Sequence, residues 1–325
     1  MDITRIEAAA ARLKGHARRT PLLGASALDE IAGRRVLVKP ECLQRTGSFK
    51  FRGGWSAVSA LPEAERKRGV IAFSSGNHAQ GVALAAREHG APAVIIMPSD
   101  APTLKIENTK ALGAEVVLYE RGGREAREEI GDRLSKERGL TLIRPYDEPE
   151  VIAGQGTCGL EVAEQAAELG VSDAEVLVCC GGGGLTAGIA LALEARAPGM
   201  QVRPAEPEGY DDTARSLRAG ERLSNATEAG GLCDAILTPM PGALTFPITS
   251  RLCGPGVVVS EEEALRAMAL AFRHLKVVAE PGGAVALAGA LFHGDAHEAE
   301  TVICTISGGN VDEAVFERAL ATLKG

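Results

Sequence analysis

Aromatic residues and positive charge are both scarce in this chain of 325 residues. Phe, Trp and Tyr together make up 3% of the residues, too few for the stacking platforms that bind single-stranded nucleic acids. The 35 Lys and Arg residues are outnumbered by 43 Asp and Glu, which gives a net charge of -8 at pH 7, and no basic stripe is visible. We therefore expect no nucleic-acid partner.

Paired cysteines and long apolar runs are also missing. No apolar run approaches the roughly 20 residues that a membrane span needs, and the first residues, 1–6, lack the apolar core of a signal peptide. The odd number of cysteines and the absence of a Cys-x-x-Cys pair favour buried thiols in a reducing cytoplasm over a disulfide or zinc framework. The seven are Cys42, Cys158, Cys179, Cys180, Cys233, Cys253 and Cys304.

What the sequence does contain is an alternation of short apolar runs with helical patterns, which predicts an α/β fold with parallel sheets covered by helices on both faces. The length suggests two domains. The predicted strands are 35–39, 70–74, 93–97, 115–119, 175–180, 201–205 and 301–306. The predicted helices are 3–13, 53–61, 78–89, 103–112, 124–137, 149–169, 185–194, 261–275 and 284–291. Residues 218–247 are predicted to form a long loop region near a site.

Lys50 is unusual because Phe49 and Phe51 flank it between two glycine turns. A desolvated amine loses its proton more easily and becomes a nucleophile that can hold an aldehyde cofactor, pyridoxal phosphate above all, as a Schiff base. The alternative is a lysine whose charged end reaches solvent at the edge of a loop.

Three further segments follow predicted strands, at the edge where parallel sheets bind ligands. Hydroxyls and free N–H groups in 74–80 suit a carboxylate, or form a plain helix cap. Four consecutive glycines, 181–184, let N–H groups converge on a phosphate, although no Lys follows as in a nucleotide phosphate loop. Ser307, before two glycines, presents a hydroxyl to a ring nitrogen or forms a tight turn.

The order of these segments resembles a known family, the fold-type II (tryptophan synthase β-like) pyridoxal phosphate enzymes of the threonine/serine dehydratase and serine racemase group, which includes 3-hydroxyaspartate dehydratases. The matching segments span nearly the whole chain. They are 46–53, 74–78, 97–98, 101–105, 113–117, 151–156, 181–184, 280–284 and 307–310.

The resemblance implies a role for each matching position. Lys50 would form the Schiff base, Phe49 would pack on the ring, Asn77 would bind the phenolic oxygen and Ser307 would face the pyridine nitrogen. The phosphate would lie against Gly181, Gly182, Gly183 and Gly184, with Leu185 and Glu280 also near the cofactor. The substrate α-carboxylate would be held by Ser74, Ser75, Gly76, Asn77 and His78. A neutral hydroxyl at the pyridine nitrogen makes the ring a weaker electron sink, which favours β-elimination over transamination.

Two positions point to a subgroup. Ser75 stands where serine racemases carry a second base on the face opposite the lysine. Arg127 matches an arginine that racemase-like members direct toward the substrate, where it could pair with a second carboxylate. The alternative for Arg127 is a solvated helix arginine in a charge-rich run.

The resemblance also implies a divalent cation, Mg²⁺, Mn²⁺ or Ca²⁺, bound by the carboxylates of Glu206 and Asp212 and the backbone carbonyl of Tyr210. A bare acidic loop is the alternative. A homodimer is implied too, with a large cofactor-binding domain of residues 1–50 and 147–325 and a small mobile domain of residues 51–146.

The prediction is a cytoplasmic pyridoxal phosphate-dependent dehydratase, or ammonia-lyase, that converts a β-hydroxy-α-amino acid to a 2-oxo (or imino) acid and ammonia. The candidate substrates are 3-hydroxyaspartate, serine and threonine, with a racemase side activity. The alternatives are a threonine/serine dehydratase without dicarboxylate preference, a serine racemase, an enzyme of β-replacement and a cofactor-binding protein without catalytic activity. From a different class comes a nucleotide-binding module that uses the four glycines 181–184.

Overall fold

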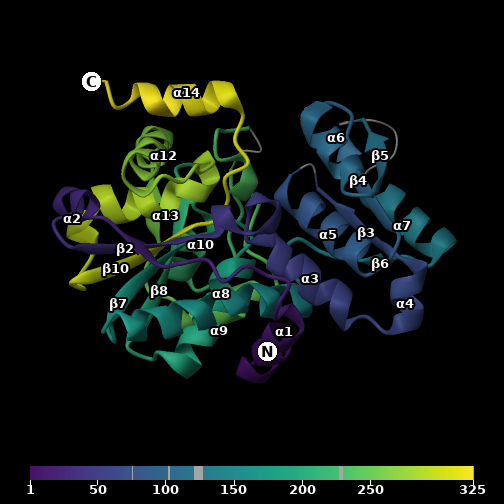
Figure 1. Ribbon diagram of the computed structural model, residues 1–325, viewed down its shortest axis with the longest axis horizontal. Helices are drawn as coiled ribbons and strands as arrows, with labels where there is room; N and C mark the ends of the chain where they lie inside the picture. The colour runs from purple at the N-terminus through teal and green to yellow at the C-terminus, as the bar shows by residue number, and fades with distance from the viewer. Residues whose placement is uncertain (75, 102, 121–126, 227–229, 325) are drawn as a thin grey trace.

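The computed structural model describes residues 1–74, 76–101, 103–120, 127–226 and 230–324, without the side chains of Leu104, Arg127 and Glu128. Two sheets lie beside each other and are covered by helices (Figure 1). All pairs of neighbouring strands in these sheets are parallel except β1 (Leu23–Gly24) with β2 (Arg35–Pro40), in agreement with the predicted α/β fold. Within these residues, no helix is both long and apolar enough to cross a membrane.

The larger sheet has six strands in the order β1-β2-β10-β7-β8-β9. Only β1 is antiparallel to its neighbour, β2. In register, Val302 of β10 lies opposite Val36 of β2 on one side and Glu175 of β7 on the other. The strands are β1 (Leu23–Gly24), β2 (Arg35–Pro40), β7 (Ala174–Cys179), β8 (Met200–Pro207), β9 (Val257–Val259) and β10 (Thr301–Ile306).

The smaller sheet has four parallel strands in the order β5-β4-β3-β6. All of them come from one continuous stretch of the chain, so this sheet forms a lobe of its own, drawn in blue and teal in Figure 1. The strands are β3 (Val70–Phe73), β4 (Ala93–Pro98), β5 (Glu115–Tyr119) and β6 (Thr141–Leu142).

Helices cover both faces of each sheet. Those of the first half are α1 (Ile3–Leu13), α2 (Ser26–Ala32), α3 (Lys50–Ala60), α4 (Glu63–Arg68), α5 (Asn77–Glu88), α6 (Thr103–Ala111), α7 (Arg127–Arg138) and α8 (Pro149–Glu168). Those of the second half are α9 (Gly184–Arg196), α10 (Asp212–Ala219), α11 (Thr245–Leu252), α12 (Glu261–Leu275), α13 (Pro281–Phe292) and α14 (Glu313–Ala321). The short 3₁₀ helices of the described residues are η1 (Glu41–Leu43), η2 (Arg45–Gly47), η3 (Asp234–Ile236) and η4 (Gly294–Ala296).

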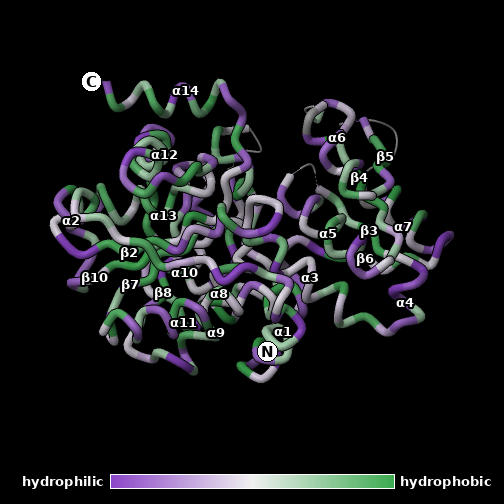
Figure 2. The backbone as a smooth tube through the Cα atoms, viewed as in Figure 1, coloured by the Kyte–Doolittle hydropathy of each residue, from purple (hydrophilic) through white to green (hydrophobic). Residues whose placement is uncertain are grey.

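The alternation of side chains along buried strands explains why both faces are covered. In β3, Val70 and Ala72 belong to the apolar cluster under α3 and α5, whereas Ile71 belongs to the opposite cluster with Ile130 of α7. A strand with apolar residues on both faces exposes neither of them, as expected for a parallel sheet. Apolar stretches of the strands in the two lobes are visible as green segments in Figure 2.

The sequence located most elements but missed three short strands and the helices α2, α4, α10, α11 and α14. Each predicted strand is confirmed with ends within two residues. Ser260 and Glu263 form a capping box at the start of α12. The start of the predicted helix 124–137 lies outside the described residues. The strands β1, β6 and β9 were not predicted because they are two or three residues long, too short for a periodic pattern.

Candidate active site

A cavity of about 460 Å³ lies where the segments that follow β2, β3 and β7 converge. It is lined by Phe49, Lys50, Ser74, Gly76, Asn77, His78, Gly181, Gly182, Gly183, Gly184, Leu185 and Glu280, all of which the sequence singled out. The predicted loop region contributes residues 234–238 to the same wall, so its expected place near a site is confirmed. The tertiary structure thus brings the carboxyl ends of strands from both sheets to a single pocket.

Lys50 is the first residue of α3, and its amine is held at the cavity wall. Nζ donates a hydrogen bond to the backbone carbonyl of Pro145 at 2.8 Å and lies 5.1 Å from the centre of the Phe49 ring. Burial lowers the pKa of Lys50 to about 8, although the nearby Glu280 carboxyl raises it. An amine with this pKa is partly deprotonated near neutral pH and is therefore able to act as a nucleophile or a base.

The position of Lys50 depends on close packing between α3 and α8. A Cβ atom added to Gly53 would lie 2.3 Å from Nε2 of Gln155, and one added to Gly154 would lie 2.4 Å from the carbonyl oxygen of Arg52. Glycine at both positions lets the two helix backbones approach each other. Since Pro145 precedes α8, the same contact fixes the lysine and the carbonyl that receives its hydrogen bond.

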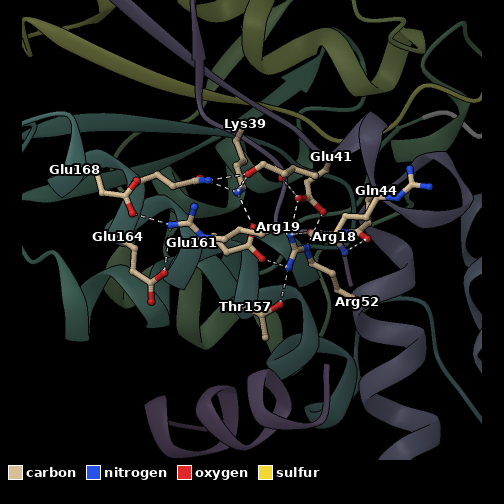
Figure 3. A network of polar contacts seen from close by, with 12 residues as sticks. Arg18, Arg19, Lys39, Glu41, Gln44, Arg52, Thr157, Glu161, Glu164 and Glu168 are labelled. Atoms are coloured by element: carbon tan, nitrogen blue, oxygen red, sulfur yellow. Dashed lines mark hydrogen bonds and ion pairs between the residues drawn. The ribbon is translucent and has the colours of Figure 1, made fainter. Parts of the chain in front are cut away.

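A buried ion network holds the first turn of α3 through Arg52 (Figure 3). The Arg52 guanidinium donates to both carboxylate oxygens of Glu41, at 2.7 and 2.8 Å, and to both of Glu161, at 2.8 Å each. Nζ of Lys39 completes the network by donating to Glu161 at 2.6 Å. Burial alone would raise the pKa of Glu41, but Arg52 holds it below its ordinary value. Two cations facing two carboxylates leave this network without net charge.

The glycine loop 181–184 leads from β7 into α9 and could not carry side chains. A Cβ atom at Gly182 would lie 2.3 Å from the Tyr146 ring, and one at Gly181 would lie 3.0 Å from the carbonyl oxygen of Ile236. Gly183 has φ of +88°, a left-handed conformation that favours glycine. The backbone N–H groups of the glycine loop, at the start of α9, suit a phosphate. The loop therefore fits the anchor that the sequence predicts for pyridoxal phosphate.

Asn77 and Glu280 meet across the cavity. The Asn77 amide donates one hydrogen to Oε1 of Glu280 at 2.7 Å, and its oxygen accepts a hydrogen bond from Asn310 at 2.7 Å. Burial raises the pKa of Glu280 to about 8, despite the lowering effect of the hydrogen bond from Asn77. An amide has a second hydrogen, which is the donor that a phenolic oxygen of the cofactor would need.

The N-terminus of α5 presents backbone N–H groups to the cavity from Asn77 onward. The His78 ring does not strengthen this anion site by its charge: burial lowers its pKa to about 3, and Nε2 pairs with the carbonyl of Ile143 at 3.0 Å. Nδ1 of His78 is buried and has no hydrogen-bond partner among the described residues. Ser74 accepts a hydrogen bond from the Gly76 N–H at 3.1 Å, which shapes the turn before the helix.

Some predicted positions lie away from the cavity or outside the description. Ser307 is buried directly after β10, where its carbonyl accepts a hydrogen bond from the Phe49 N–H at 3.0 Å, but it is not among the described residues that line the cavity. Ser75 and the Arg127 side chain lie outside the described residues. Tyr210 and Asp212 stand at the start of α10, remote from Lys50 in the chain and not part of the cavity wall.

Tyr146, Lys105 and Asp234 are among the cavity residues for which the sequence indicated no role. Tyr146 covers the glycine loop, and Lys105 and Asp234 face each other with Nζ and Oδ2 3.3 Å apart. Lys105 ends one of the segments that carry the family resemblance, and Asp234 lies in the loop region predicted near a site. The sequence therefore contained a signal for each residue. Neither signal showed that the two side chains meet, because that depends on the packing of distant segments.

The predicted cation site has two close carboxylates but no third ligand of the same kind among the described residues. Glu206 accepts hydrogen bonds from the N–H groups of Thr213 and Ala214, and burial raises its pKa to about 8, with the Asp212 charge adding to the effect. Burial also raises the pKa of Asp212 to about 6. Within the part of the chain that the structure describes, no cluster of three or more His, Cys, Asp or Glu side chains could hold a metal ion.

Comparison with known proteins identifies the family. The model of the family described as "Pyridoxal-phosphate dependent enzyme" matches residues 13–308. An L-threo-3-hydroxyaspartate ammonia-lyase of Pseudomonas sp. is 43% identical over 317 residues, which cover 98% of this chain and 97% of the relative. A serine racemase of Oryza sativa subsp. indica is 38% identical, covering 98% and 94%.

Solved structures agree with the fold. The crystal structure of a T.th. threonine deaminase has a TM-score of 0.90 and 44% identity, and the match covers 96% of this chain and 99% of that one. Maize serine racemase has a TM-score of 0.90 and 35% identity, covering 99% and 98%. The predicted fold class and family are thereby confirmed, and this chain belongs to the family of pyridoxal-phosphate dependent enzymes.

Proposed function

We propose that this chain is a pyridoxal phosphate-dependent ammonia-lyase that removes the β-hydroxyl and amino groups of a β-hydroxy-α-amino acid, with 3-hydroxyaspartate as the preferred substrate. The observation that carries the proposal is the amine of Lys50, whose pKa is lowered by burial to about 8, in one cavity with the glycine loop and the N-terminus of α5. Similarity to two L-threo-3-hydroxyaspartate ammonia-lyases, at 43% and 41% identity, supports the substrate.

Different residues of the cavity would bind different parts of the cofactor. Pyridoxal phosphate supplies an electron sink for bond cleavage at Cα when it is bound. Lys50 would hold it covalently, and the N–H groups of the glycine loop 181–184 would bind its phosphate. Phe49 would pack on the ring, with Leu185 and Glu280 beside it. Asn77 would donate its second amide hydrogen to the phenolic oxygen, and Ser307 would face the pyridine nitrogen as a neutral partner.

The substrate α-carboxylate would lie at the N-terminus of α5, where the N–H groups of 76–78 and the Ser74 hydroxyl are donors. Since the His78 ring is neutral, this position would contribute its backbone N–H rather than its side chain. Lys50, once released by the substrate, would take the Cα proton at Nζ. Ser75 would be the base on the opposite face, and Arg127 a cation near the substrate.

The remaining inferences concern the whole protein. We infer a small mobile domain of residues 51–146, supported by its separate sheet, and a large domain of residues 1–50 and 147–325. Closure of one on the other would exclude water from the cavity. A homodimer and a divalent cation at Glu206, Tyr210 and Asp212 are part of the proposal. Seven free cysteines support a reducing, cytoplasmic location.

A panel of substrates tests the function. Release of 2-oxo acid and ammonia is measured for serine, threonine and the stereoisomers of 3-hydroxyaspartate, and we expect the largest kcat/KM for a 3-hydroxyaspartate. Lys50→Met should reduce turnover by at least about 10³-fold, because it removes both the covalent attachment and the base. Lys110→Met, an exposed lysine of α6, is the matched control.

Each alternative predicts a different outcome of the same assays. A serine racemase, favoured by the 38% identity to the rice enzyme, would form D-serine faster than it forms pyruvate. A β-replacement enzyme would incorporate sulfide instead of releasing a 2-oxo acid. A nucleotide-binding module would be colourless, whereas the proposed enzyme is yellow and carries, after borohydride reduction, a cofactor adduct on Lys50. Better use of threonine than of any 3-hydroxyaspartate would contradict the proposed substrate.

A further inference from the structure

An ion pair between Lys105 and Asp234 spans the cavity. Lys105 lies in the first turn of α6, beside the smaller sheet, and Asp234 begins η3 in the loop region of the larger lobe. Nζ and Oδ2 are 3.3 Å apart, and the side chain of Lys105 is 22% exposed against 62% for Asp234. A pair this open to solvent contributes little to stability. Its carboxylate is also easily replaced by a competing anion.

Lys105 is the second positively charged side chain, besides Lys50, among the described residues that line the cavity. Among the described residues that line the cavity, the cations are Lys50 and Lys105, since the His78 ring is neutral. Lys50 is required for the cofactor, and the N-terminus of α5 already suits the substrate α-carboxylate. Among the described residues, Lys105 is therefore the cation left to bind a second carboxylate of the substrate.

The charged side chains in this part of the cavity wall interact electrostatically with one another. The Glu280 carboxyl, buried in the same wall, interacts electrostatically with Asp234, Lys105 and Lys50. Because Lys105 and the lysine that would bind the cofactor both act on Glu280, both cations lie within electrostatic range of the same buried carboxyl group. The helices α5 and α6 also contact each other, so the two anion-binding positions belong to one lobe.

We propose that Lys105 determines specificity by binding the second carboxylate of a dicarboxylic amino-acid substrate, and that Asp234 is the counter-ion that this carboxylate displaces. The inference rests on the proposed function and names the side-chain class that the site selects. With serine or threonine the Lys105–Asp234 pair stays closed. With a dicarboxylate, the substrate replaces Asp234 at Nζ.

The two partners therefore have opposite effects on specificity. Lys105→Met removes the cation but keeps a long side chain, so the ratio of kcat/KM for 3-hydroxyaspartate to that for serine should fall about tenfold or more with the loss of one charge-assisted hydrogen bond. Asp234→Asn removes the competing anion, so the same ratio should rise by about two- to fivefold. Lys110→Met, on the exposed side of α6, should leave the ratio unchanged.

A binding measurement separates this inference from the proposed function. Succinate and butyrate have four carbons but differ in one carboxylate, and their Kd values for the holoenzyme are measured by calorimetry. Lys105→Met should weaken succinate about tenfold and leave butyrate unchanged. If the wild-type holoenzyme binds succinate in this way but turns over no hydroxy amino acid, the proposed function is wrong and the role of Lys105 stands.

Two results would overturn the role of Lys105. The first is an equal loss with serine and 3-hydroxyaspartate in both variants, since a pair that only steadies lobe closure would affect all substrates alike. The second is an unchanged ratio in Lys105→Met together with a collapsed ratio in Arg127→Ala, which would assign the second carboxylate to Arg127.

Discussion

The side-chain amide of Asn77 donates a hydrogen bond to Oε1 of Glu280 at 2.7 Å, although the two residues are 203 positions apart. Asn77 begins α5 in the smaller lobe, and Glu280 precedes α13 in the larger one. The bond therefore joins the two lobes at the wall of the cavity. It also leaves a carboxyl group buried beside the position proposed for the cofactor, with a pKa raised to about 8.

Glu280 should make the stability of the cofactor-free protein fall with rising pH. The ordinary pKa of a glutamate is 4.5 and the folded value is about 8, so between these limits the unfolded chain loses its proton first. The contribution of Glu280 to the free energy of unfolding should decline from about pH 5 and level off above pH 8. Glu280→Gln should flatten this slope, measured by urea unfolding at pH 5, 6.5 and 8.

Glu206 also has a pKa raised to about 8, so part of the slope will remain in Glu280→Gln. The exposed Glu262 on α12 provides the matched control, and Glu262→Gln should keep the wild-type slope. A slope that Glu280→Gln leaves unchanged would show that this carboxyl is already ionised in the folded protein.

Gly182→Ala should weaken cofactor binding. The added Cβ would lie 2.3 Å from the Tyr146 ring, so the loop or the ring must move. Overpacking of this kind costs about 1–3 kcal/mol, which corresponds to a Kd for pyridoxal phosphate about 5- to 150-fold larger. Gly294→Ala, where the nearest atom would be 3.7 Å away, serves as control. Fluorescence titration of the cofactor-free proteins gives the Kd values, and wild-type affinity in Gly182→Ala would argue against phosphate binding at this loop.

Arg52→Met should destabilise the fold by about 3–5 kcal/mol, because it leaves the carboxylates of Glu41 and Glu161 without their main partner. Arg52 and Glu41 are 1% and 0% exposed. The neighbouring pair of Arg19 with Glu168, also drawn in Figure 3, is 49% and 64% exposed. Arg19→Met should therefore cost at most about 1 kcal/mol. Urea unfolding compares the two variants, and similar losses would show that burial does not govern the strength of this network.

A divalent cation should raise the melting temperature more at pH 8 than at pH 6. Burial raises the pKa values of Glu206 to about 8 and Asp212 to about 6, so protons compete with the cation at lower pH. Oδ2 of Asp212 is buried with no hydrogen-bond partner among the described residues, as a ligand atom would be. Scanning calorimetry with Mg²⁺, Mn²⁺ or Ca²⁺ and with EDTA measures the shift.

Asp212→Asn should abolish the response to the cation, and Asp173→Asn, an exposed acid elsewhere, should preserve it. A melting temperature that none of the three cations changes at pH 8 would leave Glu206 and Asp212 as an ordinary acidic pair.

Local sequence determined much of this protein. The periodic patterns located the longer strands and helices, because a buried strand or an amphipathic helix is marked by neighbouring residues. The resemblance carried by Lys50, the glycine loop and the segment 74–78 identified the family, which the comparisons confirmed. The roles of the individual residues, and the domain boundaries, stay predictions.

Tertiary structure decided what depends on distant partners. The pKa of Lys50 follows from burial at a wall that includes Pro145, 95 residues away, and no local pattern encodes that desolvation. Tyr146 meets Gly182, and Lys105 meets Asp234, only because the two lobes are packed against each other. The sequence thus specified which chemical groups are present. Packing determined which of them face one another, because side-chain contacts and desolvation are properties of the folded chain.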